Sequence, residues 1–202
     1  MVTGQGNDEA EQETNRPAAR TLTDPAMMRA LNHPARLSIA QHLGATAAAA
    51  TATELAGVVG LSPSATSYHL RAMARAGLIE EAAGRGDARE RRWQIVGGGW
   101  QLEGDRSAGP ERRAAEEALV ATLLALANDR ITQWLARADD EPPEWADAVT
   151  ISDTALLVTA AELAEITEAY RELVRPYLRR DRSSPPAGAR VVSAHFRAVP
   201  ST

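Results

Sequence analysis

The sequence contains neither cysteine nor lysine, so all 22 of its basic side chains are arginines. The lack of cysteine excludes disulfide bonds, thiolate metal sites and redox sensing through thiols. The four histidines are scattered and lack the paired spacing of metal ligands, so no metal or other cofactor is expected. They are His33, His42, His69 and His195.

Long apolar runs are also missing. No stretch approaches the roughly 20 apolar residues of a membrane span, and the N-terminus does not resemble a signal peptide. These absences favour a cytoplasmic protein without a membrane partner. The sequence shows no Ser/His/Asp set, no glycine-rich phosphate loop and no metal-ligand motif. An enzyme is therefore not expected.

Charge is distributed unevenly along the chain. The 202 residues carry a formal net charge of −5. Between Arg71 and Arg92, however, six arginines accompany four carboxylates, which gives a local balance of +2. Specific DNA binding depends on such local charge rather than on the total. A chain of this length is expected to form one or two domains.

Residues 51–77 carry the clearest local signals. Thr51 and Glu54 form a T-x-x-E capping box, which predicts a helix start. Gly60 suits the left-handed turn that ends such a helix. Ser62 and Pro63 then open a second helix, because serine caps free N–H groups and proline is tolerated at the first helical position. Two helices joined by so short a turn predict a helix-turn-helix.

The second of these helices has two distinct faces. Thr66, Leu70 and Met73 follow a helical period and are expected to point inward. Another face carries hydroxyl and guanidinium groups, which can donate to phosphates and base edges. The predicted DNA-binding residues of this helix are Ser62, Ser64, Thr66, Ser67, Tyr68, Arg71 and Arg75. The alternative interpretation is an ordinary capped surface helix.

A hairpin is predicted after this helix. Residues 78–81 and 91–96 favour strands, and the glycines of 84–87 favour a turn between them. A helix-turn-helix followed by such a hairpin is a winged helix. The predicted DNA-binding residues of the wing are Arg85, Arg89, Arg91 and Arg92.

Residues 24–96 resemble the ArsR-like family of bacterial winged-helix repressors. The resemblance rests on LSPSATSYHLRAMARAGLIE, on the hairpin GRGDARERRW and on the upstream ALNHPARLSIAQHL. It implies a DNA-binding transcription regulator. Many ArsR-like proteins sense metals through cysteines near the DNA-binding helices. Because this chain has no cysteine, the metal-sensor role is not carried over.

The polar residues 1–22 are expected to form a disordered tail. Two helices are then predicted over 26–31 and 35–43, because Pro34 separates them and opens the second. Arg36 lies in the first turn of the second helix, where a cation gains nothing from the helix dipole. A DNA phosphate or Glu54 could pair with it, and structural pairing is preferred. The inward positions are Ile39, Ala40 and Leu43.

His69 is interpreted as a histidine wedged between helices and hydrogen-bonded locally, rather than as a ligand or a catalytic group. Residues 103–109 form a polar linker with turn-forming residues, which predicts a domain boundary there.

Residues 110–138 predict one long helix with two adjacent apolar stripes. An arc this wide exceeds what one small domain normally covers. We expect one side to pack on its own subunit and the other on a second copy; the alternative is a helix buried in a monomeric core. The expected dimerisation residues are Leu119, Val120, Leu123, Leu124, Ala127, Ile131 and Trp134.

The C-terminal part predicts a strand, a helix and a second strand. Residues 151–158 and 191–198 have strand-like composition or alternation. Between them, Thr159 and Glu162 form another capping box, which opens a helix that extends to about residue 178. Its inward side chains are expected to be Leu163, Ile166, Tyr170, Leu173 and Val174. This arrangement also resembles actinobacterial members of the ArsR-like group, whose effectors are mostly unassigned.

The predicted fold class is mainly α, within α+β. Residues 1–22 form the tail, residues 23–100 the winged helix-turn-helix domain, and residues 110–202 a dimerisation domain that could also receive a small-molecule effector. The long dimerisation helix precedes the small strand–helix–strand module.

The leading functional hypothesis is a homodimeric repressor that binds double-stranded DNA at a palindromic operator. The recognition helix would occupy the major groove, and the wing would contact the backbone or the minor groove. The alternative, from another class, is a winged-helix interaction module that does not bind DNA.

Overall fold

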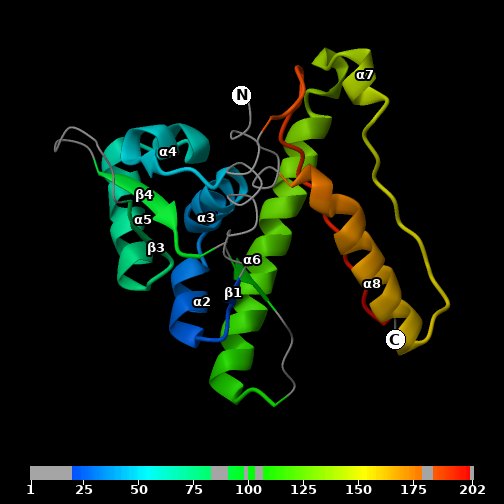
Figure 1. Cartoon of the computed structure of the whole chain (residues 1–202), viewed down its shortest axis with the longest axis horizontal. Helices are drawn as coiled ribbons and strands as arrows, with labels where there is room; N and C mark the ends of the chain where they lie inside the picture. The colour runs from blue at the N-terminus through cyan, green and yellow to red at the C-terminus, as the bar shows by residue number, and fades with distance from the viewer. Residues whose placement is uncertain (1–19, 83–90, 98–99, 103–106, 179–183, 201–202) are drawn as a thin grey trace, which may run out of the picture. The chain divides into compact units, whose positions relative to one another are not determined.

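The computed structural model describes residues 20–82, 91–97, 100–102, 107–178 and 184–200. The chain divides into two compact units, Met1–Leu123 and Leu124–Thr202, and each is described by itself. The chain is mainly helical with a small sheet, as predicted, and the first unit has the winged helix-turn-helix fold (Figure 1).

Four helices make up most of the first unit. They are α2 (Pro25–Leu31), α3 (Pro34–Thr46), α4 (Ala52–Val59) and α5 (Pro63–Arg75). Each begins after a residue whose side chain accepts a hydrogen bond from a backbone N–H of the first turn. The caps are Asp24, His33, Thr51 and Ser62. Both helices predicted before residue 44 are confirmed, although α3 continues to Thr46.

The predicted helix-turn-helix is confirmed in detail. The Thr51 hydroxyl accepts from the Glu54 N–H at 3.2 Å, and the Glu54 carboxylate accepts from the Thr51 N–H at 2.7 Å. Gly60 ends α4 with a φ of 66°, a left-handed conformation that strongly favours glycine. Ser62 then caps α5 by accepting from the Ala65 N–H at 3.2 Å.

The predicted hairpin strands are confirmed as part of a three-stranded antiparallel sheet. Strands β3 (Ile79–Glu81) and β4 (Arg92–Ile95) pair with Glu81 opposite Trp93. Strand β2 (Ala50–Thr51) pairs with the other edge of β4. The predicted turn over 84–87 lies outside the described residues.

The start of the folded unit is earlier than predicted. Strand β1 (Arg20–Thr21) pairs in parallel with β5 (Trp100–Gln101), and the N–H of Leu22 donates to the Gln101 carbonyl at 2.8 Å. Leu22 is buried. The expected tail over 1–22 is therefore wrong for its last three residues, because pairing with β5 and burial of Leu22 hold them in the folded unit.

The core of the first unit lies between these helices and the sheet. The inward positions predicted for α3 and α5 are buried, and Leu37 of α3 joins them. The largest fully buried side chains of the unit include Met28, Leu31, Leu37, Ile39, Leu43, Leu55, Leu70, Met73 and Ile79.

Helix α6 (Pro110–Leu135) belongs to both units, because the division between them falls at Leu123. Its first half packs in the first unit: Ala115 and Leu119 are buried, Arg29 pairs with Glu111 at 2.9 Å, and the Thr122 hydroxyl donates to Asn32. The division at 103–109 expected from composition differs from this one, since a polar linker does not prevent the following helix from packing back.

The second unit contains the rest of α6, the 3-10 turn η1 (Ala138–Asp140), α7 (Pro143–Ala146), α8 (Ala160–Val174) and the 3-10 turn η2 (Arg175–Tyr177). The capping box of α8 is confirmed. Among the predicted inward side chains of this helix, Leu173 is instead 69% exposed. Within the described part of 124–202, only Ala127 is buried.

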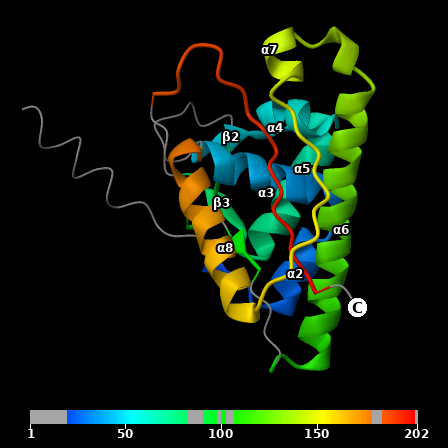
Figure 2. The same ribbon diagram turned by 90° about the vertical axis from the view of Figure 1, so that its right-hand side faces the viewer.

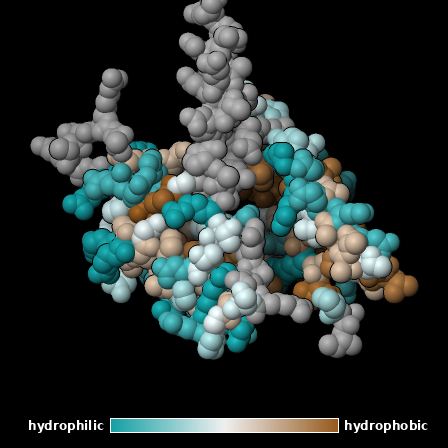
Figure 3. Space-filling view, turned by 60° about the horizontal axis from the view of Figure 1, so that its bottom comes forward, coloured by the Kyte–Doolittle hydropathy of each residue, from teal (hydrophilic) through white to brown (hydrophobic). Residues whose placement is uncertain are grey.

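The two strands predicted around α8 are wrong. Residues 149–159 and 189–200 contain no assigned strand, and Figure 2 shows them, in yellow and red, as traces without arrows. A segment with strand-like composition forms a strand only when a neighbouring strand supplies partners for its backbone hydrogen bonds. On the right of Figure 3, where Figure 1 places α8 and the segment before it, brown apolar side chains lie at the surface.

The last segment is nevertheless attached to helices of its own unit. The Phe196 ring stacks on Tyr170 of α8 with centroids 4.8 Å apart. Arg190 pairs with Glu141 at 2.7 Å and lies over the Trp145 ring.

Candidate nucleic-acid interface

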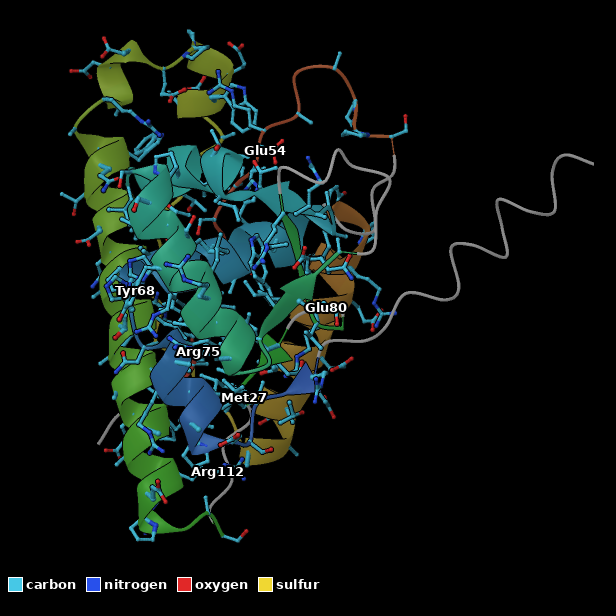
Figure 4. The ribbon with its side chains drawn as sticks, turned by 90° about the vertical axis from the view of Figure 1, so that its left-hand side faces the viewer. Met27, Glu54, Tyr68, Arg75, Glu80 and Arg112 are labelled. Atoms are coloured by element: carbon cyan, nitrogen blue, oxygen red, sulfur yellow. The ribbon has the colours of Figure 1, made fainter. Side chains whose placement is uncertain are left out.

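The outer face of α5 combines small hydroxyls with large donors. Ser64, Tyr68, Arg71 and Arg75 are all exposed, and Tyr68 is 61% exposed. In Figure 4, Tyr68 and Arg75 lie along the side of α5 that is turned to the viewer. Neither Arg71 nor Arg75 forms an ion pair with a described residue. The face therefore presents guanidinium groups whose donors remain available to a ligand.

Two of the seven residues predicted on this helix have other roles. Thr66 is fully buried and its hydroxyl donates to the Ser62 carbonyl at 3.0 Å, so it cannot reach DNA. Its position belongs to the inward stripe with Leu70, so the prediction of Thr66 as a DNA-binding residue is wrong. The Ser62 hydroxyl is engaged in capping α5. Ser67 is half-buried beside the exposed face.

The wing arginines differ in what the structure shows of them. Arg85 and Arg89 lie outside the described residues. Arg91 is exposed, and its Nε lies 3.8 Å from the Glu81 carboxylate across the hairpin. At 3.8 Å this pair is too long for a hydrogen bond, so the donors of Arg91 remain available for phosphate contact.

Arg92 connects the wing to α4. Its guanidinium donates to the Ala49 carbonyl at 2.6 Å and lies 3.4 Å from the Glu54 carboxylate. Hydrogen bonds from Thr51 lower the pKa of Glu54 below its usual range, and the Arg92 charge lowers it further. Glu54, the partner suggested for Arg36, thus pairs with Arg92. This arrangement fixes the start of the helix-turn-helix to the sheet.

A cluster that the sequence did not indicate lies between α3 and α5. The His33 and His69 rings are 4.6 Å apart, and Tyr68 contacts His69 edge-on at 5.6 Å. The His33 Nδ1 caps α3 by accepting from the Ala35 N–H at 3.2 Å. Within this cluster, the Arg36 Nε and the His69 Nδ1 are buried without a hydrogen-bond partner among the described residues. His69 lies between α5 and the start of α3, as expected for a histidine wedged between helices, and no described residue forms a hydrogen bond with its Nδ1.

The expected dimerisation residues fall on two faces of α6. Leu119 is fully buried in its own chain and has no surface to offer a partner. It lies about 140° around the helix from Leu124. Ala127 is also buried, while Leu123 and Trp134 are half-buried. The exposed members are Val120, Leu124 and Ile131, and the structure adds Leu135 to them.

Among the described residues, no group of three or more His, Asp or Glu side chains could hold a metal ion. Within the same part of the chain, no helix has the length and apolarity needed to cross a membrane.

Comparison with known proteins supports the assignment of α4 and α5 as a helix-turn-helix. Residues 31–82 match the family model described as a helix-turn-helix domain, and this range contains α3, α4, α5 and β3. No curated protein matches the chain significantly. The matched region is thus a helix-turn-helix domain, the type of domain found in DNA-binding regulators.

Proposed function

We propose that this protein is a sequence-specific, DNA-binding transcriptional regulator of the ArsR-like type, acting as a homodimeric repressor in the cytoplasm. The observation that carries the proposal is the outer face of α5. It follows a short turn, exposes Ser64, Tyr68, Arg71 and Arg75, and has no carboxylate paired with either arginine among the described residues.

The placement of donors on α5 suits the major groove. A recognition helix inserts its N-terminal half, where base edges are within reach. Arg71 can donate two hydrogen bonds to a guanine, and serine can donate to or accept from any base pair. Arg91 of the wing would contact the adjacent backbone.

A homodimer is supported by surface that the single chain leaves uncovered. Val120, Leu124, Ile131 and Leu135 form an exposed stripe along α6. The described part of 124–202 has almost no buried residue of its own, and such a unit gains stability by burying apolar surface against a second copy. A small-molecule effector would act by changing the distance between the two recognition helices, since these must match half-sites about one DNA turn apart.

Genomic binding-site selection with the purified full-length protein tests the proposal. We expect enrichment of a palindromic sequence, and an affinity for it that falls steeply with salt. Affinity for random DNA of the same length should be weaker by a factor of at least about 10³. If no sequence is enriched, and binding is weak and insensitive to salt, the winged helix is an interaction module rather than a DNA-binding domain.

A further inference from the structure

A half-buried arginine without a counter-charge lies beside the recognition helix. Arg36 occupies the first turn of α3, and its Nε is buried without a hydrogen-bond partner. No carboxylate among the described residues pairs with it. Burying part of a cation without a partner is unfavourable, and an anion bound at the solvent-accessible part of the Arg36 guanidinium would reduce this cost.

The neighbours of Arg36 are donors or neutral rings rather than acids. Burial lowers the pKa of Arg36, and only the Tyr68 phenol opposes this effect. Burial, followed by the charge on Arg36, lowers the pKa of His33 below its usual range. The same holds for His69, where His33 also contributes. The cluster therefore presents one fixed cation and two neutral imidazoles.

The location of the cluster indicates which anion it would meet. Tyr68 lies on the outer face of α5, and it contacts His69, which in turn contacts His33. The cluster thus borders the face assigned to the major groove. The two sugar–phosphate backbones line that groove, and contacts to their phosphates fix the register of a DNA-binding protein.

We propose that Arg36 and His69, flanked by Tyr68, bind one backbone phosphate of the operator DNA next to the groove that α5 enters. This inference rests on the proposed function. Arginine suits the role because its planar guanidinium donates to two phosphate oxygens at once. The site would position the protein on DNA without reading sequence.

The test compares the salt dependence of DNA affinity between the wild type and two variants that each lack one positive charge. Fluorescence anisotropy with the selected operator gives the slope of log affinity against log salt for wild type, Arg36→Gln and Arg29→Gln. We expect the slope of Arg36→Gln to be smaller by about one unit, the value for one lost phosphate contact. Arg29→Gln is the matched control, since Arg29 is already paired with Glu111, and its slope should equal that of wild type.

A second measurement needs no variant, in case Arg36→Gln fails to fold. The imidazole NMR signals of His33 and His69 in the wild-type protein should shift when operator is added. The signal of His195, which lies in the second unit, serves as the internal reference. Replacing the contacted phosphate by an uncharged methylphosphonate should abolish the shift.

The outcomes separate this proposal from the function on which it rests. An unchanged slope in a folded Arg36→Gln variant, or unshifted His33 and His69 signals in a wild type that binds its operator, would overturn the phosphate site alone. Signals that respond to inorganic phosphate but not to operator would assign the site to a free anion and also overturn it. A wild type without sequence preference would overturn the proposed function and this inference together.

Discussion

Replacing either of two glycines in or next to α4 by alanine should change the stability of the protein in opposite directions. Gly57 lies inside α4 with open space where a Cβ would go, so Gly57→Ala should raise the free energy of unfolding by about 0.4–1 kcal/mol. Gly60 has a φ of 66°, so Gly60→Ala should lower it by about 1 kcal/mol. Urea denaturation measures both, and effects of the same sign would contradict the assigned end of α4.

The clustered imidazoles predict a pH dependence of stability. The pKa values of His33 and His69 are lowered in the folded protein, so the unfolded chain binds more protons as pH falls below about 6.5. Stability should be fully present above that pH and decline toward pH 5. The melting temperature of His69→Gln should decline less over this window. A decline equal to that of wild type would show that His69 does not contribute.

Arg71 is the residue that should determine sequence preference. Arg71→Ala should weaken operator binding by about 1–3 kcal/mol and relax the preference at one base position. Arg29→Ala removes the same charge from an existing ion pair on α2 and should leave the preference unchanged. Repeating the site selection with both variants measures this. An unaltered motif for Arg71→Ala would place Arg71 outside the groove.

At the scale of elements, the two capping boxes allow a matched comparison. Thr51 is buried at the start of α4, whereas Thr159 is exposed at the start of α8. Thr51→Ala should lower the free energy of unfolding of the first unit by about 1–2 kcal/mol, at the upper end for a lost cap, because the Glu54 N–H loses its partner at a buried position. Thr159→Ala should affect only the unfolding of α8. Circular dichroism during urea denaturation measures the effect of each variant. Equally small effects of Thr51→Ala and Thr159→Ala would contradict the expected difference between the buried and the exposed cap.

Elements that carry their own signals were predictable from the sequence. The caps at Thr51, Ser62 and Thr159, and the left-handed Gly60, depend on residues close in the chain. Their geometry follows from local chemistry, and so do both ends of α4 and the start of α5.

Features that depend on distant residues were not predictable. Pairing of β1 with β5 joins residues 20 and 100, and a two-residue strand leaves no period in the sequence. The His33–His69 contact unites two helices whose sequences each look ordinary. The strand predicted over 151–158 is wrong because the composition of this segment favours a strand, but a strand forms only when another strand pairs with it.

For the whole molecule, the exposed stripe of α6 predicts the oligomeric state. Leu124 is 38% exposed in the single chain. Leu124→Glu would place a charge in the proposed dry interface, where an unpaired carboxylate is costly. The variant should remain folded, become monomeric, and lose affinity for a palindrome far more than for one half-site.

Light scattering with circular dichroism checks this prediction. Ala125→Glu adds the same charge at an exposed position about 100° around the helix, and it should remain dimeric. A wild type that is already monomeric at micromolar concentration would overturn the dimer, and a Leu124→Glu variant that unfolds would assign Leu124 to the core of its own subunit.

Thr51 belongs to two structures at once, and this has a kinetic consequence. It pairs with Arg92 in the sheet and caps α4, while Arg92 also lies 3.4 Å from the Glu54 carboxylate. The cap that nucleates α4 is therefore held by a strand about forty residues later in the chain. The local capping box can start α4, but the pairing that holds Thr51 in the sheet also needs closure of that long loop. Hydrogen exchange of the backbone amides of α4 and β4 should accordingly occur through one shared opening of the structure. Strand β4 and the helix-turn-helix would then unfold as a single cooperative unit.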